Sequence, residues 1–178
     1  NPYYVAVAEE INRLLTRTGY HLQLAASADD PKVQQNILRN MIGHGVDGII
    51  WVPSQVDDEL ADYLRTHHVP MVSIVRRVPG DFIDTVVFED YNGSRVVMQH
   101  LLNLGHERIG YVAGNVQHSS NLARWRGYQA AIREAGLPNH DELQKLGSAG
   151  ASWGKVATLD LLHLSSPPTA IFVASNPM

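Results

Sequence analysis

The stretch HLLNLGHERIGYVAGNVQHSSNLARWRGYQAA, residues 100–131, decides the fold. It predicts the end of a helix, a stop at Gly105, a buried strand, a polar loop and a second helix that carries Arg124 in its first turn. Open α/β folds bind ligands where the carboxyl end of a strand meets a polar loop and the start of a helix. The stretch therefore predicts both the fold class and the position of a binding site.

The same alternation of helices and short apolar runs fills the rest of the chain. Helices are predicted over residues 2–18, 31–44, 56–66, 92–104, 122–135 and 153–164, and strands over residues 20–26, 48–53, 69–75, 85–88, 108–113, 143–146 and 169–174. Strands that alternate with helices are typical of βαβ units, in which parallel strands are buried under helices. The predicted fold class is α/β, with parallel sheets flanked by helices.

One link breaks this alternation and indicates two lobes. RRVPGDFID, residues 76–84, contains no helix, although parallel neighbours usually need a crossover of about a dozen residues or more. We therefore expect the chain to change sheet near Phe88. The expected domains are an N-terminal lobe over residues 1–88, without its first strand, and an incomplete C-terminal lobe over residues 89–178.

Composition limits the partners that this chain can bind. Its 178 residues include 14 Lys and Arg against 18 Asp and Glu, so the strongly basic surface that grips a phosphate backbone is not expected. The absence of cysteine excludes disulfides and thiolate metal sites, and the nine histidines form no metal-ligand pattern. No apolar run is long enough to span a membrane, and no signal peptide is expected. We predict a cytoplasmic protein with no membrane partner, metal or cofactor.

Two glycine motifs match known patterns by spacing alone. Residues 43–48 (GHGVDG) fit the GxGxxG pattern of dinucleotide sites, but they are expected to close a helix and lead into a strand, the reverse of the required order. Residues 150–154 (GASWG) fit the GxSxG pattern of a hydrolase nucleophile elbow. The acid and base that remain, Asp160 and His163, share the next helix with Ser152 and cannot turn back onto it. A helix cap at Ser152 is the favoured interpretation, and a serine hydrolase is the enzyme alternative.

The residues favour a binding site over a catalytic one. Arg124 follows the loop after a predicted strand, where its guanidinium can donate two hydrogen bonds to vicinal hydroxyls or to a carboxylate. Ser120 can donate to the same ligand, and three aromatic residues can stack on a sugar face: Phe88, Tyr3 and Tyr4. Each has a plainer alternative, which is a surface salt bridge for the arginine, a helix cap for the serine and core packing for an aromatic.

Six phrases spread over nearly all of the chain occur in a specific order. They are NPYY, GHGVDGIIWVPS, VPMVSI, HLLNLGHERIGYVAG, RWRGYQAAIREAGL and PPTAIFVASN. This series resembles the effector-binding domain of the LacI/GalR family of bacterial transcription regulators. The resemblance implies a two-lobed fold of the periplasmic-binding-protein type (type I), whose lobes close over a small effector and thereby change the affinity for DNA.

The resemblance also implies a ligand site. Arg124, three residues before the pair Gly127-Tyr128, matches the main polar clamp of the family. Ser120 matches a Ser or Thr that contacts the ligand, and Phe88 matches an aromatic residue at the crossover between lobes. Tyr3 and Tyr4 match the point where the first helix reaches the cleft.

The sequence departs from the family pattern at several positions. Val75 stands where many sugar-binding members carry Asp, and Ala149 stands where a stacking aromatic is common. Ser175 stands where a sugar-binding Asn is frequent, and its hydroxyl is still expected to contact the ligand. Glu89 and Asp90 resemble the usual Asp-Asn only in charge and size. These departures predict a cleft with less polar content than that of a typical sugar regulator.

The resulting prediction is an effector-sensing and dimerisation region of a LacI-type regulator. Its expected partners are a small sugar-like effector, a second copy in a homodimer, and operator DNA bound through a helix-turn-helix head that this chain does not contain. The alternative is a periplasmic sugar-binding protein that delivers its ligand to a transporter. The upstream sequence separates the two, because a regulator needs a basic helix-turn-helix and a periplasmic protein needs a signal peptide.

Overall fold

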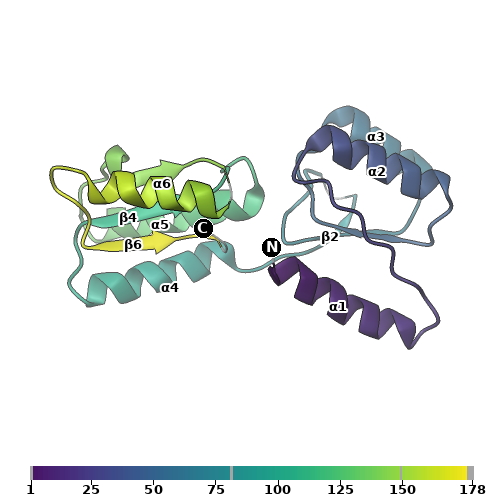
Figure 1. The fold of residues 1–178 in the computed structure, drawn as a ribbon, viewed down its shortest axis with the longest axis horizontal. Helices are drawn as coiled ribbons and strands as arrows, with labels where there is room; N and C mark the ends of the chain where they lie inside the picture. The colour runs from purple at the N-terminus through teal and green to yellow at the C-terminus, as the bar shows by residue number, and fades with distance from the viewer. Residues whose placement is uncertain (1, 81, 149, 176–178) are drawn as a thin grey trace. The chain divides into compact units, whose positions relative to one another are not determined.

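The computed structural model describes residues 2–80, 82–148 and 150–175, and Figure 1 shows the order of their helices and strands. The chain forms two compact units, residues 1–46 and residues 47–178. Among the described residues, no helix is both long enough and apolar enough to cross a membrane.

The first unit contains two helices, α1 (Pro2–Thr16) and α2 (Pro31–Gly43). The Asp30 carboxylate caps α2 by accepting hydrogen bonds from the backbone N–H groups of Lys32 and Val33, at 2.8 and 3.1 Å. Pro31 suits the first helical position because its φ is already fixed there. α2 ends at Gly43, and strand β1 begins at Ile49, so residues 43–48 close a helix and lead into a strand as predicted.

The strand predicted over residues 20–26 is wrong. This segment has no regular secondary structure, and Tyr20 and Leu24 are 51% and 73% exposed. A short apolar run is typical of a strand, but a strand forms only where a neighbour accepts and donates its backbone hydrogen bonds. The described part of residues 1–46 contains no other extended segment that could provide this ladder.

The second unit begins with a parallel three-stranded sheet of order β1-β2-β3. Its strands are β1 (Ile49–Trp51), β2 (Met71–Ile74) and β3 (Asp84–Val86), and α3 (Asp58–His67) connects the first two. The Asp57 side chain caps α3 by accepting from the backbone N–H of Leu60 at 2.8 Å. Leu60 and Leu64 are buried, whereas Asp58 and Glu59 are exposed, as the amphipathic pattern of α3 requires.

The link between β2 and β3 corrects one step of the sequence argument. The two strands are parallel neighbours, although the described residues between them, 75–80 and 82–83, contain no helix. A link of this length can extend over roughly 30 Å. A strand as short as β3 needs a return of only about 10 Å along the sheet, so an irregular loop is sufficient. The change of sheet expected near Phe88 is nevertheless confirmed, because every strand after β3 belongs to a different sheet.

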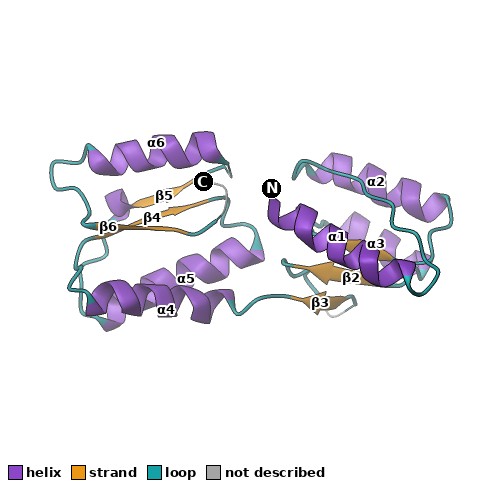
Figure 2. Cartoon of the chain, turned by 60° about the horizontal axis from the view of Figure 1, so that its bottom comes forward, coloured by secondary structure: helices purple, strands orange, loops and turns teal. Residues whose placement is uncertain are grey.

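The second sheet is also parallel and has the order β5-β4-β6. It is built from α4 (Asp90–Asn103), β4 (Ile109–Ala113), α5 (Ser119–Glu134), the short helix η1 (Asp141–Leu143), β5 (Gln144–Leu146), α6 (Ala151–Leu162) and β6 (Ala170–Val173). Figure 2 shows α6 on one face of this sheet and α4 with α5 on the other. The predicted α/β class with helix-flanked parallel sheets is confirmed.

Strand β4 forms the centre of the second sheet, and all five of its residues are buried. Tyr111 packs between α4 and α5, where its ring stacks on that of Tyr128 at 4.8 Å. Val112 points to the opposite face and packs against Leu161 of α6. Gly127 allows α5 to approach α4 closely, since a Cβ at this position would lie 2.5 Å from the Tyr91 carbonyl oxygen. This packed core supports the carboxyl end of the sheet.

Candidate functional site

Arg124 lies in α5 and extends to the carboxyl end of the second sheet. Its Nε donates to Asp90 Oδ1 at 2.7 Å, and its Nη1 donates to the carbonyl oxygen of Ala174 at 2.6 Å. Ala174 directly follows β6. The Arg124 side chain is 26% exposed, and its Nη2 has no hydrogen-bond partner among the described residues. The guanidinium is therefore held in place with donors left for a ligand.

Asp90 is a site residue that sequence reasoning missed. It begins α4, where the helix N-terminus stabilises a carboxylate, and its side chain is only 7% exposed. Its partner Arg124 is 34 positions away, so the ion pair exists only in the folded chain. The available signal was the acidic pair Glu89-Asp90 before a predicted helix start. The surface salt bridge considered for Arg124 is thus a largely buried one.

The helix that carries Arg124 begins at Ser119, three residues earlier than predicted. His118 occupies the cap position, so the helix-cap alternative for Ser120 is wrong. Ser120 is the second helical residue and is 6% exposed. It lies four positions before Arg124, and residues at this spacing share one helix face. Its predicted contact with a ligand stays a prediction.

Ser175 and Phe88 are close in sequence to the two residues that Arg124 contacts, Ala174 and Asp90. Ser175 is half-buried and follows the Ala174 carbonyl that Arg124 binds. Phe88 lies between β3 and α4, two positions before Asp90, and is 55% exposed. Core packing is therefore wrong for Phe88. Its stacking on a ligand stays a prediction, as does the ligand contact of Ser175.

Tyr3 and Tyr4 lie on the first turn of α1, in the first compact unit. Their rings meet edge to face with centroids 5.3 Å apart, and Tyr3 is 38% exposed. Neither ring is part of a buried core. Their meeting with a ligand at Arg124 stays a prediction.

The loops at the carboxyl end of the second sheet are fixed by side chains. Asn121 Nδ2 donates to the carbonyl oxygen of Asn115 at 2.9 Å, and Asn115 Oδ1 accepts from the backbone N–H of Gln117 at 2.9 Å. The Trp153 indole donates to the carbonyl oxygen of Ala113 at 3.0 Å. A site built on such loops is formed before any ligand arrives, which reduces the entropy lost on binding.

Tyr111 contributes a buried hydroxyl beneath the same end of the sheet. Its oxygen has no hydrogen-bond partner among the described residues. Burial raises the pKa of this hydroxyl, and the charges of Arg124 and Asp90 act on it in opposite directions. The phenol is therefore neutral over the physiological range and supplies packing rather than charge.

Val75 has a strained backbone where β2 ends. Its φ is +69°, and the N–H of Arg76 donates to the carbonyl oxygen of Ile74 at 2.7 Å, which closes a tight γ-turn. A β-branched side chain rarely adopts this conformation. Val75 is also 8% exposed, so its side chain is buried at the end of the first sheet.

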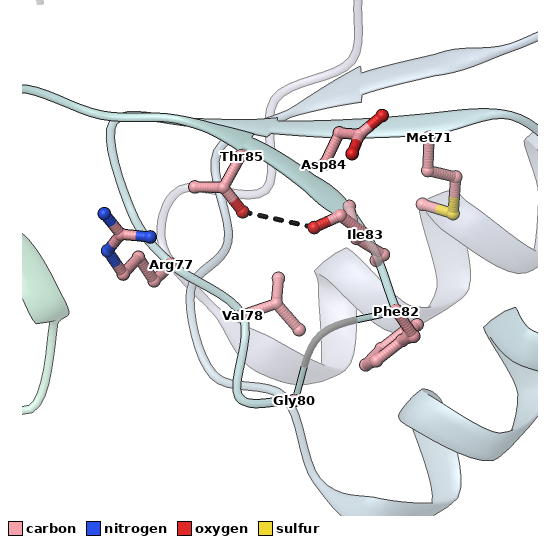
Figure 3. Close-up of a pocket in the computed structure, with 8 residues that line it drawn as sticks. All are labelled: Met71, Arg77, Val78, Gly80, Phe82, Ile83, Asp84 and Thr85. Carbon is pink, nitrogen blue, oxygen red and sulfur yellow. Dashed lines mark hydrogen bonds between the residues drawn. The ribbon is translucent and has the colours of Figure 1, made fainter.

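A hollow of about 480 Å³ lies beside the first sheet, and Figure 3 shows the residues that line it. Apolar side chains form part of its lining, polar Arg77, Asp84 and Thr85 complete it, and Thr85 Oγ1 donates to the carbonyl oxygen of Ile83 at 3.3 Å. Met71 and Asp84 begin their strands, so the hollow reaches the amino ends of β2 and β3. Ligands of open α/β folds bind at the carboxyl ends. Arg124 therefore marks the better candidate site.

A family model described as periplasmic binding proteins and sugar binding domain of LacI family matches residues 1–177. The chain belongs to this family. It is 30% identical to catabolite control protein A of Priestia megaterium over 179 aligned positions, which cover 100% of this chain and 54% of that protein. It is 28% identical to the HTH-type transcriptional repressor PurR of Actinobacillus pleuropneumoniae serotype 5b over 175 positions, covering 98% of this chain and 52% of the repressor.

A solved structure supports the same assignment of this LacI-family chain. The crystal structure of a putative ribose operon repressor from Burkholderia thailandensis superposes with a TM-score of 0.85 and 27% identity. The match covers 99% of this chain and 65% of that one. The chain thus spans about half the length of the curated relatives it matches.

The family consists of binding domains, and the hydrolase alternative has no support in the LacI-family chain. Ser152 is the second residue of α6, and the helix cap is Gly150, so the predicted cap at Ser152 is wrong. Asp160 is eight positions further along the same helix, roughly 12 Å away by helical rise. The helix ends at Leu162, and His163 is its C-cap. Among the described residues, no group of three potential metal ligands exists.

The described residues show one of the departures from the LacI-family pattern directly. Val75, which replaces a frequent Asp, is buried and strained rather than polar and open. Ala149 and residues 176–178 lie outside the described residues.

Proposed function

We propose that this chain is the effector-binding region of a LacI-type transcriptional regulator and binds a sugar-like small molecule at Arg124. The observation that carries the proposal is the guanidinium itself, which is fixed by Asp90 and Ala174 and keeps its Nη2 donors for a ligand. The free N–H groups lie in one rigid plane and can donate to neighbouring hydroxyls of a ligand.

The other predicted contacts complete the proposed pocket. Ser120 adds a hydroxyl on the same face of α5, and Ser175 adds another beside the Ala174 anchor. Phe88, Tyr3 and Tyr4 supply aromatic faces for the apolar side of a sugar ring. The N-terminal lobe in this proposal covers residues 1–88 and the C-terminal lobe covers residues 89–178.

The relatives support a regulator rather than a transport protein. Catabolite control protein A and PurR are named as a control protein and a transcriptional repressor. By analogy, the full-length protein acts in the cytoplasm as a homodimer, and its effector changes the affinity of a separate helix-turn-helix head for operator DNA.

A thermal-shift screen of the full-length protein tests the binding proposal. The probes are sugars, sugar phosphates, polyols and purines, because a ligand at a hundred times its dissociation constant adds about 2.7 kcal/mol of stability. We expect at least one sugar or polyol to raise the melting temperature.

The site assignment is tested with two arginine variants on the same helix. Arg124→Ala should abolish the shift caused by the responding ligand, whereas Arg126→Ala should keep it, because Arg126 is exposed. A shift that survives in Arg124→Ala would move the site elsewhere. A protein that responds to none of the sugars or polyols would not be a sugar sensor.

A further inference from the structure

We infer that the Arg124 site selects neutral hydroxylated ligands over phosphorylated or carboxylated ones; this deepens the proposed function and rests on it. An isolated arginine would attract anions. Here the guanidinium is paired at 2.7 Å with an Asp90 carboxylate that is only 7% exposed. The pair carries no net charge, and water screens the buried carboxylate poorly.

The neighbouring charges make the site less favourable for an anion. Glu89 precedes Asp90 and is exposed, so it adds a negative charge beside the pair. The first turn of α4 already holds Asp90, which uses the favourable positive end of that helix. Arg77 meets α5 through its backbone N–H, which donates to Ser119 Oγ at 2.8 Å, while its side chain lines the hollow beside the first sheet (Figure 3).

The geometry nevertheless suits a neutral ligand with several hydroxyls. Nη2 of Arg124 donates to a hydroxyl oxygen, and a hydroxyl proton can be donated in turn to the second oxygen of Asp90. A carboxylate has no proton to donate and would face Asp90 with like charge. A phosphate can keep a proton at neutral pH, but its net negative charge would still face the Asp90 carboxylate. Asp90 is thus a specificity-determining residue that acts through Arg124 and through its own charge.

Asp90→Asn separates charge from shape, because asparagine keeps an oxygen that can accept from Arg124 Nε. Glu134→Gln is the matched control. It also removes one negative charge from an ion pair between α4 and α5, but the pair that Glu134 forms with Arg95 is exposed. An effect of net charge alone would appear equally in both variants.

Inorganic phosphate is the first probe, and it requires no sugar binding. At constant ionic strength, calorimetric titration of the full-length wild-type protein should detect no phosphate binding that depends on Arg124. Asp90→Asn should gain it, Glu134→Gln should not, and the double variant Asp90→Asn with Arg124→Gln should lose it again. Phosphate binding to the wild type that disappears in Arg124→Gln would overturn the inference, whether or not any sugar binds.

Matched ligands are the second probe. Glucose, ribose and fructose are each compared with their monophosphates. A carboxylate about 6 Å from a ligand phosphate should weaken binding by about tenfold or more. We expect each neutral sugar that binds to exceed its phosphate by this factor, and Asp90→Asn to shift the ratio by about tenfold toward the phosphate.

The two probes separate two kinds of failure. A phosphate ester that binds the wild type more tightly than its sugar, or a ratio that Asp90→Asn leaves unchanged, would overturn the charge inference while leaving the sensor proposal intact. If no sugar of either kind binds but the inorganic phosphate results follow expectation, the sensor proposal fails together with the preference for neutral sugars, and only the exclusion of anions by Asp90 holds.

Discussion

The two parallel sheets of this chain have the same number of strands, but their carboxyl ends are built differently. The central strand of the second sheet, β4, is buried along its whole length. The carboxyl end of this sheet is held by the hydrogen bonds of Arg124. The central strand of the first sheet, β2, is only partly buried and ends in the strained turn at Val75. A rigid, hydrogen-bonded end is suited to recognition, whereas a strained end stores conformational energy. The comparison indicates that the carboxyl end of the second sheet is the more rigid of the two.

Truncating one isoleucine in each sheet gives the largest predicted contrast. Ile109 of β4 is fully buried, and Ile109→Ala should lower the free energy of unfolding by about 2–5 kcal/mol through lost burial and a residual cavity. Ile50 of β1 is 46% exposed, so Ile50→Ala should cost about 1 kcal/mol or less. Urea denaturation measures both, and equal losses would contradict the difference in burial.

The contact between α4 and α5 can be tested with two glycines. Gly127→Ala would place a Cβ 2.5 Å from the Tyr91 carbonyl oxygen and 2.7 Å from Ser94 Cβ, so it should destabilise the protein by about 1–3 kcal/mol. Gly93→Ala in α4 meets nothing within 4 Å and should stabilise by about 0.5–1 kcal/mol through helix propensity. Thermal melting of both variants checks the opposite signs. A tolerated Gly127→Ala would mean that the helices can separate.

The two stacked tyrosines differ in their hydroxyl partners. Tyr128 donates to the carbonyl oxygen of Ile109 at 2.9 Å, so Tyr128→Phe leaves a buried acceptor unpaired and should cost about 1–2 kcal/mol. The Tyr111 hydroxyl has no partner among the described residues, so Tyr111→Phe should be neutral or stabilising. The measurement is urea denaturation at neutral pH, and a large loss in Tyr111→Phe would reveal a partner such as an ordered water.

Alkaline pH should weaken the second sheet through the same tyrosines. Burial raises the pKa of Tyr128 to about 12 from an ordinary value of 10.0. A raised folded-state pKa gives stability that is complete below pH 10 and is lost as the pH rises toward 12, because the unfolded phenol ionises first. At pH 11 the loss from this group is about 1.4 kcal/mol.

Denaturation curves between pH 9 and pH 11.5 measure this slope. Tyr128→Phe should reduce it, and a second change, Tyr111→Phe, should reduce it further, because burial also raises the pKa of Tyr111. An unchanged slope in the double variant would assign the alkaline loss to other groups.

Residue patterns predicted the second sheet well because its signals are local. A helix stop at Gly105, an apolar run and a polar loop are features of adjacent residues, and they place β4 and α5 within a few positions. Asp90 was missed as a partner of Arg124 because their contact depends on how α4 and α5 pack. Residues 20–26 were misassigned for the related reason that a strand depends on a neighbour. The position of Arg124 could therefore be predicted from local sequence pattern. Its ion pair with Asp90 could not, because it depends on tertiary structure.

The smallest predicted effect tests the strained end of the first sheet. Val112→Gly in β4 should cost about 2–4 kcal/mol, because it removes a fully buried side chain and loosens a strand. Val75→Gly removes a side chain of equal size that is also buried, but it relieves a backbone strain of roughly 1–3 kcal/mol, since glycine adopts a φ of +69° without a steric clash. The two terms nearly cancel, so we expect a net change within about 1 kcal/mol in urea denaturation. A loss as large as that of Val112→Gly would mean that the turn at Val75 stores no strain, and the two sheets would then differ in burial alone.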